Sequence, residues 1–167
     1  YKEYVHREFI APGLIAPEEL VADGHCLAPA YLDHQIDRSR ENLGLHTIDI
    51  YYVHNPEQQL DVVPGEELER RLRRAFGALE AQAGGGHIRS YGCATWQGLR
   101  PPPGTRGHLG LLDLVRLARD AGGADHHFRV VQLPINLAMT EAVREPTQPL
   151  PDGRIVPLLE AASALGV

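Results

Sequence analysis

The sequence predicts an α/β fold in which parallel strands alternate with helices. Two observations support this prediction. Segments of helix length with an apolar face alternate along the chain with short apolar runs, and the connections between them are mostly short. The first of these runs, 47–54, is nearly continuous in β-branched, aromatic and apolar residues, as in a strand covered on both faces. Such a series builds a parallel sheet with helices packed on it.

The elements follow from local patterns. Residues 1–30 are rich in proline and have no sustained periodicity, so we expect an extended loop region with one helical turn at 17–20. Residues 31–167 hold the βα units, and the whole chain is expected to form one domain. The second helix has the strongest pattern, with Glu66 and Glu67 in its first turn and glycines 84–86 at its end. The expected helices are 31–43, 66–83, 109–121 and 156–165, and the expected strands are 47–54, 88–95 and 128–136.

The turn after the first strand favours a barrel over a doubly wound sheet. A doubly wound nucleotide-binding fold carries a glycine-rich turn there, but residues 54–59 read HNPEQQ. An eight-stranded barrel needs roughly 250 residues, and three strands are visible in this sequence. We therefore expect a partial (β/α)8 TIM barrel. The chain lacks an initiator Met and an apolar signal segment, so we expect its natural beginning to lie upstream.

Composition excludes several classes of protein. Of 167 residues, 43% are hydrophobic and 23% charged, which is typical of a soluble globular domain. A net charge of −6 argues against a nucleic-acid partner, and the lack of a long apolar run argues against a membrane span. Cys26 and Cys93 lie far apart, as reduced thiols in a cytoplasmic protein do. The nine histidines include no metal-ligand pair, so no metal site is expected.

The carboxyl ends of the strands are where parallel α/β proteins gather their reactive groups. The first strand presents His54, on one face with Ile50 and Tyr52. A histidine at the end of an apolar face is partly desolvated, which favours the neutral ring that still donates one hydrogen bond. A structural and a functional histidine both fit this position. The three strand ends present His54 and Asn55; Ala94, Thr95 and Trp96; and Gln132, Pro134 and Asn136.

Three motifs together resemble the aldo/keto reductase family. Residues 38–57, RSRENLGLHTIDIYYVHNPE, look like its helix-plus-strand segment that ends in the active-site histidine. Residues 85–96, GGHIRSYGCATW, are similar to its next strand, and residues 130–138, VVQLPINLA, to the strand after that. The resemblance covers 31–167 and implies strands four to six of a (β/α)8 barrel. It also implies NADPH-dependent reduction of an aldehyde or ketone to an alcohol.

The resemblance implies a role for each strand end. His54 matches the residue that holds the substrate carbonyl oxygen, and Gln132 matches the glutamine that binds the nicotinamide carboxamide. Ala94 and Thr95 occupy the pair that also binds the carboxamide, although Ala94 offers only its backbone. The residues expected to line the substrate mouth are Asn55 and Trp96.

Other parts of the family pattern have no match in this sequence. The general-acid tyrosine, its lysine and its aspartate lie on earlier strands, and Tyr1–Lys2 has no strand context. The segments that bind the 2′-phosphate come after the sixth helix. We therefore expect the isolated chain to be inactive or nearly so. Two alternatives stay open: a non-catalytic binding or regulatory relative, and a truncated remnant whose open sheet self-associates.

Overall fold

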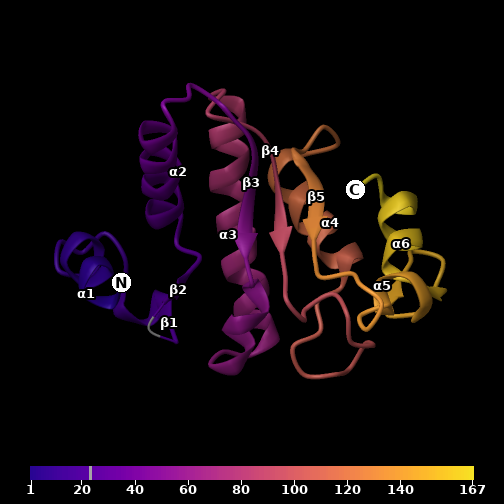
Figure 1. Ribbon diagram of the computed structural model, residues 1–167. Helices are drawn as coiled ribbons and strands as arrows, with labels where there is room; N and C mark the ends of the chain where they lie inside the picture. Colours follow the sequence, from indigo (N-terminus) through magenta and orange to yellow (C-terminus); the bar gives the residue numbers. More distant parts are fainter. Residues whose placement is uncertain (23) are drawn as a thin grey trace.

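The centre of the protein is a three-stranded parallel sheet with helices on one face (Figure 1). The computed structural model describes residues 1–22 and 24–167. The strands are β3 (Ile48–His54), β4 (Ile88–Ala94) and β5 (Phe128–Gln132), in the order β3-β4-β5. The prediction of an α/β fold with a parallel sheet is confirmed.

Three of the main helices precede or connect the strands of the parallel sheet and the fourth, α6, follows them, as the periodicity predicts. They are α2 (Pro29–Leu43), α3 (Gly65–Gly84), α4 (Leu111–Gly122) and α6 (Leu158–Leu165). Helix α2 begins with proline at its first position, where the missing N–H costs nothing, and ends at Gly44 in the left-handed conformation. Helix α3 carries Glu66 and Glu67 in its first turn, where negative charge is favourable.

The core lies between the sheet and the helices behind it. Phe76 from α3, Tyr91 from β4 and Phe128 from β5 are fully buried, and their ring centroids lie 5.2–5.7 Å apart. Tilted and edge-on contacts at this separation are favourable for aromatic rings. This aromatic cluster fixes α3 against the sheet and thereby fixes the strand ends that follow.

A close approach of backbones at Gly92 sets the alignment of β4 with β5. The register shifts between Tyr91 and Gly92, and a Cβ on Gly92 would lie only 1.7 Å from the carbonyl oxygen of Val130. Only glycine fits at such a contact. Beyond this point the two strands pair in step as far as Ala94 and Gln132.

The first thirty residues are more regular than predicted. The helical turn predicted at 17–20 is confirmed as a 3₁₀ turn, Pro17–Glu19. The loop prediction is wrong for Lys2–Ile10, which form helix α1 (Lys2–Val5) and a π-helical segment (His6–Ile10). Val5 and Phe9 are buried one helical turn apart and pack with residues of α2, which stabilises this segment. Two antiparallel strands follow, β1 (Leu20–Val21) and β2 (His25–Cys26).

The C-terminal third also departs from prediction in its boundaries. Strand β5 ends at Gln132 instead of residue 136, because Pro134 has no N–H to donate to the sheet. A 3₁₀ segment (Pro56–Asp61) follows β3, and a short helix α5 (Glu141–Arg144) follows β5. Strands β6 (Gln148–Pro149) and β7 (Ile155–Val156) pair before α6. Within residues 1–22 and 24–167, no helix has the length and apolar character needed to cross a membrane.

Candidate active site

The carboxyl ends of the three strands align on one row of the sheet. His54 pairs with Ala94, and Ala94 pairs with Gln132, so three residues predicted from separate motifs lie side by side. The alignment continues past the strands, because Asn55 N–H donates to Ala94 O at 2.6 Å and Thr95 N–H donates to Gln132 O at 2.8 Å. We call His54, Ala94 and Gln132 the strand-end row.

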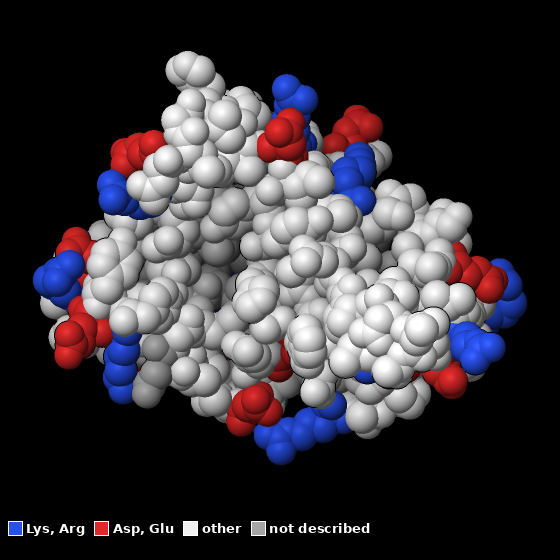
Figure 2. Space-filling view, in the orientation of Figure 1, with Lys and Arg blue, Asp and Glu red and all other residues white. Residues whose placement is uncertain are grey.

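The strand-end row opens onto the face of the sheet that the helices do not cover. The side chains of His54 and Gln132 are exposed, and Ile50, four residues earlier on β3, is 43% exposed. In Figure 2 the charged side chains lie mostly around the rim of the view, and its middle is largely uncharged. The strand-end row thus presents neutral hydrogen-bonding groups on this face.

The two residues assigned to the nicotinamide on β4 differ in what they offer. Ala94 has no side-chain hydrogen-bonding group, and its carbonyl already accepts from Asn55 N–H. Thr95 is 4% exposed, and its buried Oγ1 has no hydrogen-bond partner among the described residues. An unpartnered buried hydroxyl is costly. The structure therefore brings His54 and Gln132 together on the open face but leaves the Thr95 hydroxyl buried.

Asn55 and Trp96, the predicted substrate residues, contact each other through a hydrogen bond. Asn55 adopts a left-handed conformation (φ 46°), and its Oδ1 accepts from Trp96 N–H at 2.9 Å. Asn is among the side chains that tolerate this conformation best. The Trp96 ring is 57% exposed, so it lies at the surface beside the strand ends.

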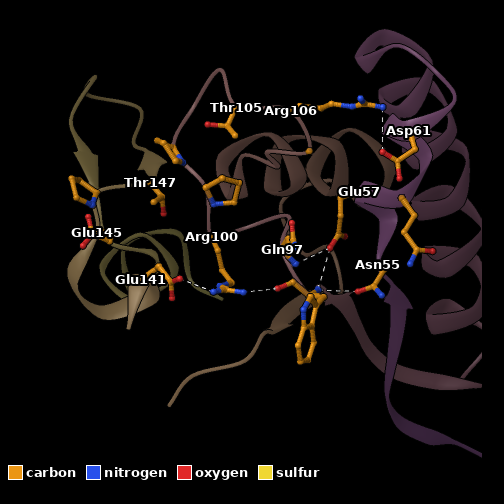
Figure 3. Close-up of a pocket in the computed structure, with 16 residues that line it drawn as sticks. Asn55, Glu57, Asp61, Gln97, Arg100, Thr105, Arg106, Glu141, Glu145 and Thr147 are labelled. Carbon is orange, nitrogen blue, oxygen red and sulfur yellow. Dashed lines mark hydrogen bonds and ion pairs between the residues drawn. The ribbon is translucent and has the colours of Figure 1, made fainter. Parts of the chain in front are cut away.

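Glu57 organises the connection after β4, and the sequence prediction missed it. Its Oε1 accepts from the backbone N–H groups of Trp96, Gln97 and Gly98 at 3.0–3.1 Å (Figure 3). Three converging N–H groups form a strong site for a carboxylate. The signal available was a carboxylate in the first turn after the strand, within the motif HNPE.

A cavity of about 940 Å³ lies beside these connections, between them and α5 (Figure 3). Asn55, Glu57 and Trp96 contribute to its wall. On the far wall Arg100 pairs with Glu141 at 2.6 Å, and the Arg100 guanidinium lowers the pKa of Glu141. His54 and Gln132 do not line this cavity. Asn55 and Trp96 thus line this cavity, whereas the predicted donor His54 does not.

His54 instead lines a smaller hollow of about 330 Å³ between α2 and β3. Tyr1, Tyr31 and Tyr51 share this hollow, and the hydroxyls of Tyr1 and Tyr31 are hydrogen-bonded to each other. Burial raises the pKa of Tyr51 to about 12 and raises those of Tyr1 and Tyr31 as well. A general acid works best with a pKa near the working pH, so these three hydroxyls are poorly tuned as proton donors.

Other reactive groups are structural. Cys26 and Cys93 are buried and unpaired, and burial raises the pKa of both thiols, that of Cys26 to about 11. Such thiols are unreactive as nucleophiles. In the part of the chain that the structure describes, no three His, Cys, Asp or Glu side chains gather to hold a metal ion.

Comparison with known families assigns the segment that contains His54. The sequence model of the aldo/keto reductase family matches residues 21–99. Over this range, which is just under half of the chain, the sequence is similar to the aldo/keto reductase family. No curated protein matches the chain. The matched range covers His54, Ala94, Thr95 and Trp96, whereas Gln132 lies beyond it.

The aldo/keto reductases are oxidoreductases that act on small molecules and generally use a nicotinamide cofactor. Gln132 fits the carboxamide of such a cofactor, because an exposed primary amide both donates and accepts. The Thr95 Oγ1 is unpartnered but buried, so it is not accessible to a ligand on the open face. Ala94 contributes shape only. The fit on this part of the sheet therefore depends mainly on Gln132.

Proposed function

We propose that this chain forms strands four to six of a (β/α)8 barrel that reduces an aldehyde or ketone to an alcohol with NADPH. The single observation that carries the proposal is the strand-end row, which places His54 and Gln132 on one exposed face. In parallel α/β proteins this edge of the sheet is where catalytic groups gather. A cytoplasmic location is consistent with two free cysteines.

In this proposal His54 is the hydrogen-bond donor to the substrate carbonyl. Hydride addition develops negative charge on the carbonyl oxygen, and a fixed N–H donor stabilises that charge more in the transition state than in the ground state. The cofactor, when bound, supplies the hydride. Gln132 binds its carboxamide and so orients the ring. Asn55 and Trp96 are the proposed substrate residues, and in this proposal the substrate extends past the turn at Asn55 into the cavity that they line.

The proton for the alcohol comes from a tyrosine outside these 167 residues in this proposal. Three tyrosines that share the hollow with His54 have raised pKa values, which supports this assignment. General acid catalysis typically contributes about 10²–10⁴-fold. The isolated chain is therefore expected to bind the nicotinamide weakly and to turn over little or no substrate.

Trp96 provides the test, because it is the only tryptophan of the sequence and lies beside the row. Titration with NADPH should quench its fluorescence, and Gln132→Ala should weaken the apparent affinity about five- to tenfold, the scale of one hydrogen bond or two. Ser90→Ala, on the same face of β4 four residues before Ala94, is the matched control and should leave the affinity unchanged. No quenching at millimolar NADPH, or equal binding by the Gln132 variant, overturns the cofactor assignment.

A non-catalytic relative is the second candidate, and the β4 strand end favours it. Ala94 offers no side-chain group and the Thr95 hydroxyl is buried, so two of the three expected carboxamide contacts are weak. The candidates separate in a protein that holds the complete barrel. For an enzyme, His54→Ala should lower kcat/KM for a carbonyl substrate by about 10²-fold or more. Detectable NADPH binding with no measurable reduction by the unaltered barrel supports the non-catalytic relative.

A further inference from the structure

The last carbonyl of β3 is bound by a side chain from a distant part of the sequence. His25 in β2 lies 2.8 Å from the carbonyl oxygen of His54 through its Nε2. On the other side of the same peptide, Asn55 N–H donates to Ala94 O. The peptide that joins His54 to Asn55 is therefore bound from both sides, by β4 on one and by His25 on the other.

The hydrogen bonds around His25 have only one consistent direction. Arg71 Nη1 lies 2.6 Å from Gln59 Oε1, and a guanidinium only donates, so this oxygen of Gln59 is the acceptor. The Gln59 amide nitrogen then faces His25 Nδ1, at 2.7 Å, and must donate to it. Because a carbonyl oxygen only accepts, the His25 proton is on Nε2. The network selects a neutral His25 in one tautomer.

The network is buried and anchored on helix α3. Gln59 is fully buried and Arg71 is 6% exposed. Arg71 also donates from Nε to Glu67 Oε1 at 2.6 Å and from Nη2 to the carbonyl oxygen of Glu18 at 3.0 Å. The side chains of Gln59 and Arg71 thus have hydrogen-bond partners throughout the network, and a buried polar network is rigid when its members are paired in this way.

The charges around His25 agree with a neutral ring. Burial lowers its pKa most, and Arg71 and His54 lower it further, whereas Glu57 and the bond to the His54 carbonyl act in the opposite direction. A second proton on Nδ1 would also place two hydrogen-bond donors, His25 Nδ1–H and the Gln59 amide, against each other at 2.7 Å. Both effects keep the ring in the state that donates to His54.

We propose that His25 is a positioning residue that fixes the His54–Asn55 peptide through a relay from Glu67, Arg71 and Gln59. The functional part of this proposal rests on the assignment of His54 as carbonyl donor. The turn at Asn55 is left-handed, and β3 is an edge strand, so its end has no neighbouring strand on the outer side within the described residues. The His25 ring occupies the place that a backbone donor would take there. Catalytic groups must be held within about 0.5 Å of their working geometry.

The first test measures the tautomer and needs no cofactor. In the ¹⁵N-labelled chain, two-dimensional NMR of the histidine rings should show His25 protonated on Nε2 only at neutral pH. Gln59→Glu replaces the amide by a carboxylate, which still accepts from Arg71 but also accepts from Nδ1. The variant should raise the His25 pKa and place a second proton on the ring. A ring titration that is unchanged by this substitution overturns the relay.

The second test measures, by amide hydrogen exchange at Asn55, how firmly the His54–Asn55 peptide is fixed. His25→Phe keeps a ring but removes both hydrogen bonds, so amide exchange at Asn55 should become about tenfold faster, while exchange at Tyr91 in the core stays slow. His25→Gln is the conservative rescue, because its amide places an acceptor toward Gln59 and a donor toward His54. Equal exchange at Asn55 in the Phe and Gln variants contradicts the proposal, even if the Phe variant is less stable.

The functional consequence is read separately in a protein that holds the complete barrel. There His25→Phe should lower kcat about tenfold with little change in KM for the cofactor, and His25→Gln should restore most of kcat. Equal kcat values for all three proteins overturn the positioning role and leave the tautomer result intact. If the unaltered chain does not bind NADPH, that result counts against the proposed function alone, because neither the NMR test nor the amide-exchange test depends on the cofactor.

Discussion

The substitution Gly92→Ala tests whether the alignment of β4 with β5 depends on one glycine. A Cβ at this position would lie 1.7 Å from Val130 O, 2.7 Å from its carbonyl carbon and 2.9 Å from its Cγ1. Two of these three atoms belong to the backbone of the neighbouring strand, so no side-chain rotation relieves the contact. The strands must separate or slip at the point where their register already shifts.

The expected cost is about 3 kcal/mol or more. Overpacking a core typically costs about 1–3 kcal/mol, and separation of the strands adds ladder hydrogen bonds to the loss. At about 2–4 °C per kcal/mol for a chain of this size, Tm should fall by roughly 6–12 °C. Urea denaturation followed by far-UV circular dichroism measures the same change as a lower midpoint. Because the Ala94–Gln132 pair lies two residues beyond Gly92, quenching of Trp96 by NADPH should weaken as well.

Gly77→Ala is the matched control. Gly77 lies within α3, it is exposed, and a Cβ there would have no atom within 4 Å. Alanine in an exposed helix interior is favoured over glycine by about 0.5–1 kcal/mol, so this substitution should raise the urea midpoint. The same chemical change is thus predicted to have opposite signs at two positions. Equal midpoints for the Gly92 variant and the unaltered chain would refute the reasoning.

Two further predictions concern the helix that supports the sheet. Glu80→Ala removes the carboxylate that accepts a hydrogen bond from the buried Tyr91 hydroxyl at 2.9 Å, and it should lower the free energy of unfolding, measured in urea, by about 2 kcal/mol. Adding Tyr91→Phe removes the unpaired hydroxyl and should recover part of this stability. An equally unstable double variant contradicts this account. Hydrogen bonds from Arg70 and Arg71 lower the pKa of Glu67 from 4.5 to about 2. The stabilisation from this depressed pKa is therefore complete above about pH 4.5 and is lost as the pH falls toward 2. Glu67→Gln should flatten the pH dependence of stability in that window, and identical curves for both proteins count against it.

Hydrophobic periodicity predicted the parts of the fold that local pattern controls. The stripe of α3 specifies a buried face, and both α3 and β3 lie close to the predicted bounds. The expectation that β3 is covered on both faces is wrong, because Val53 is its only buried residue and Ile50 is 43% exposed on the face that the helices leave open. Lys2–Ile10 were missed, because the signal is only one pair, Val5 and Phe9, in a segment too short for a period to emerge. The end of β5 was placed too late, because an apolar stretch continues past the proline that stops the ladder.

In the candidate site, too, local features could be predicted from the sequence and contacts between distant segments could not. His54 was predicted because it ends an apolar run, and a strand end is a local feature. Gln132 lies inside the predicted strand 128–136, and its role was assigned from the family resemblance instead. Their position on one row depends on the register, which a close backbone contact at Gly92 sets between two different strands. His25 and Gln59 were missed for a similar reason. A polar residue that becomes buried in a network looks the same in sequence as one that stays in water, until its remote partners are known.

The conformation of each strand end is determined largely by residues of another connection. Glu57 follows β3, yet its carboxylate binds three consecutive N–H groups after β4. His25 precedes α2, yet its ring binds the final carbonyl of β3. Main-chain groups are the targets in both cases, so neither interaction depends on the side chain at the targeted position. It follows that a search for the determinants of this site should begin with charged or ring-bearing residues whose partners are main-chain atoms of a neighbouring strand end. The geometry of the β3 end therefore depends on His25 as well as on the residues of the strand itself.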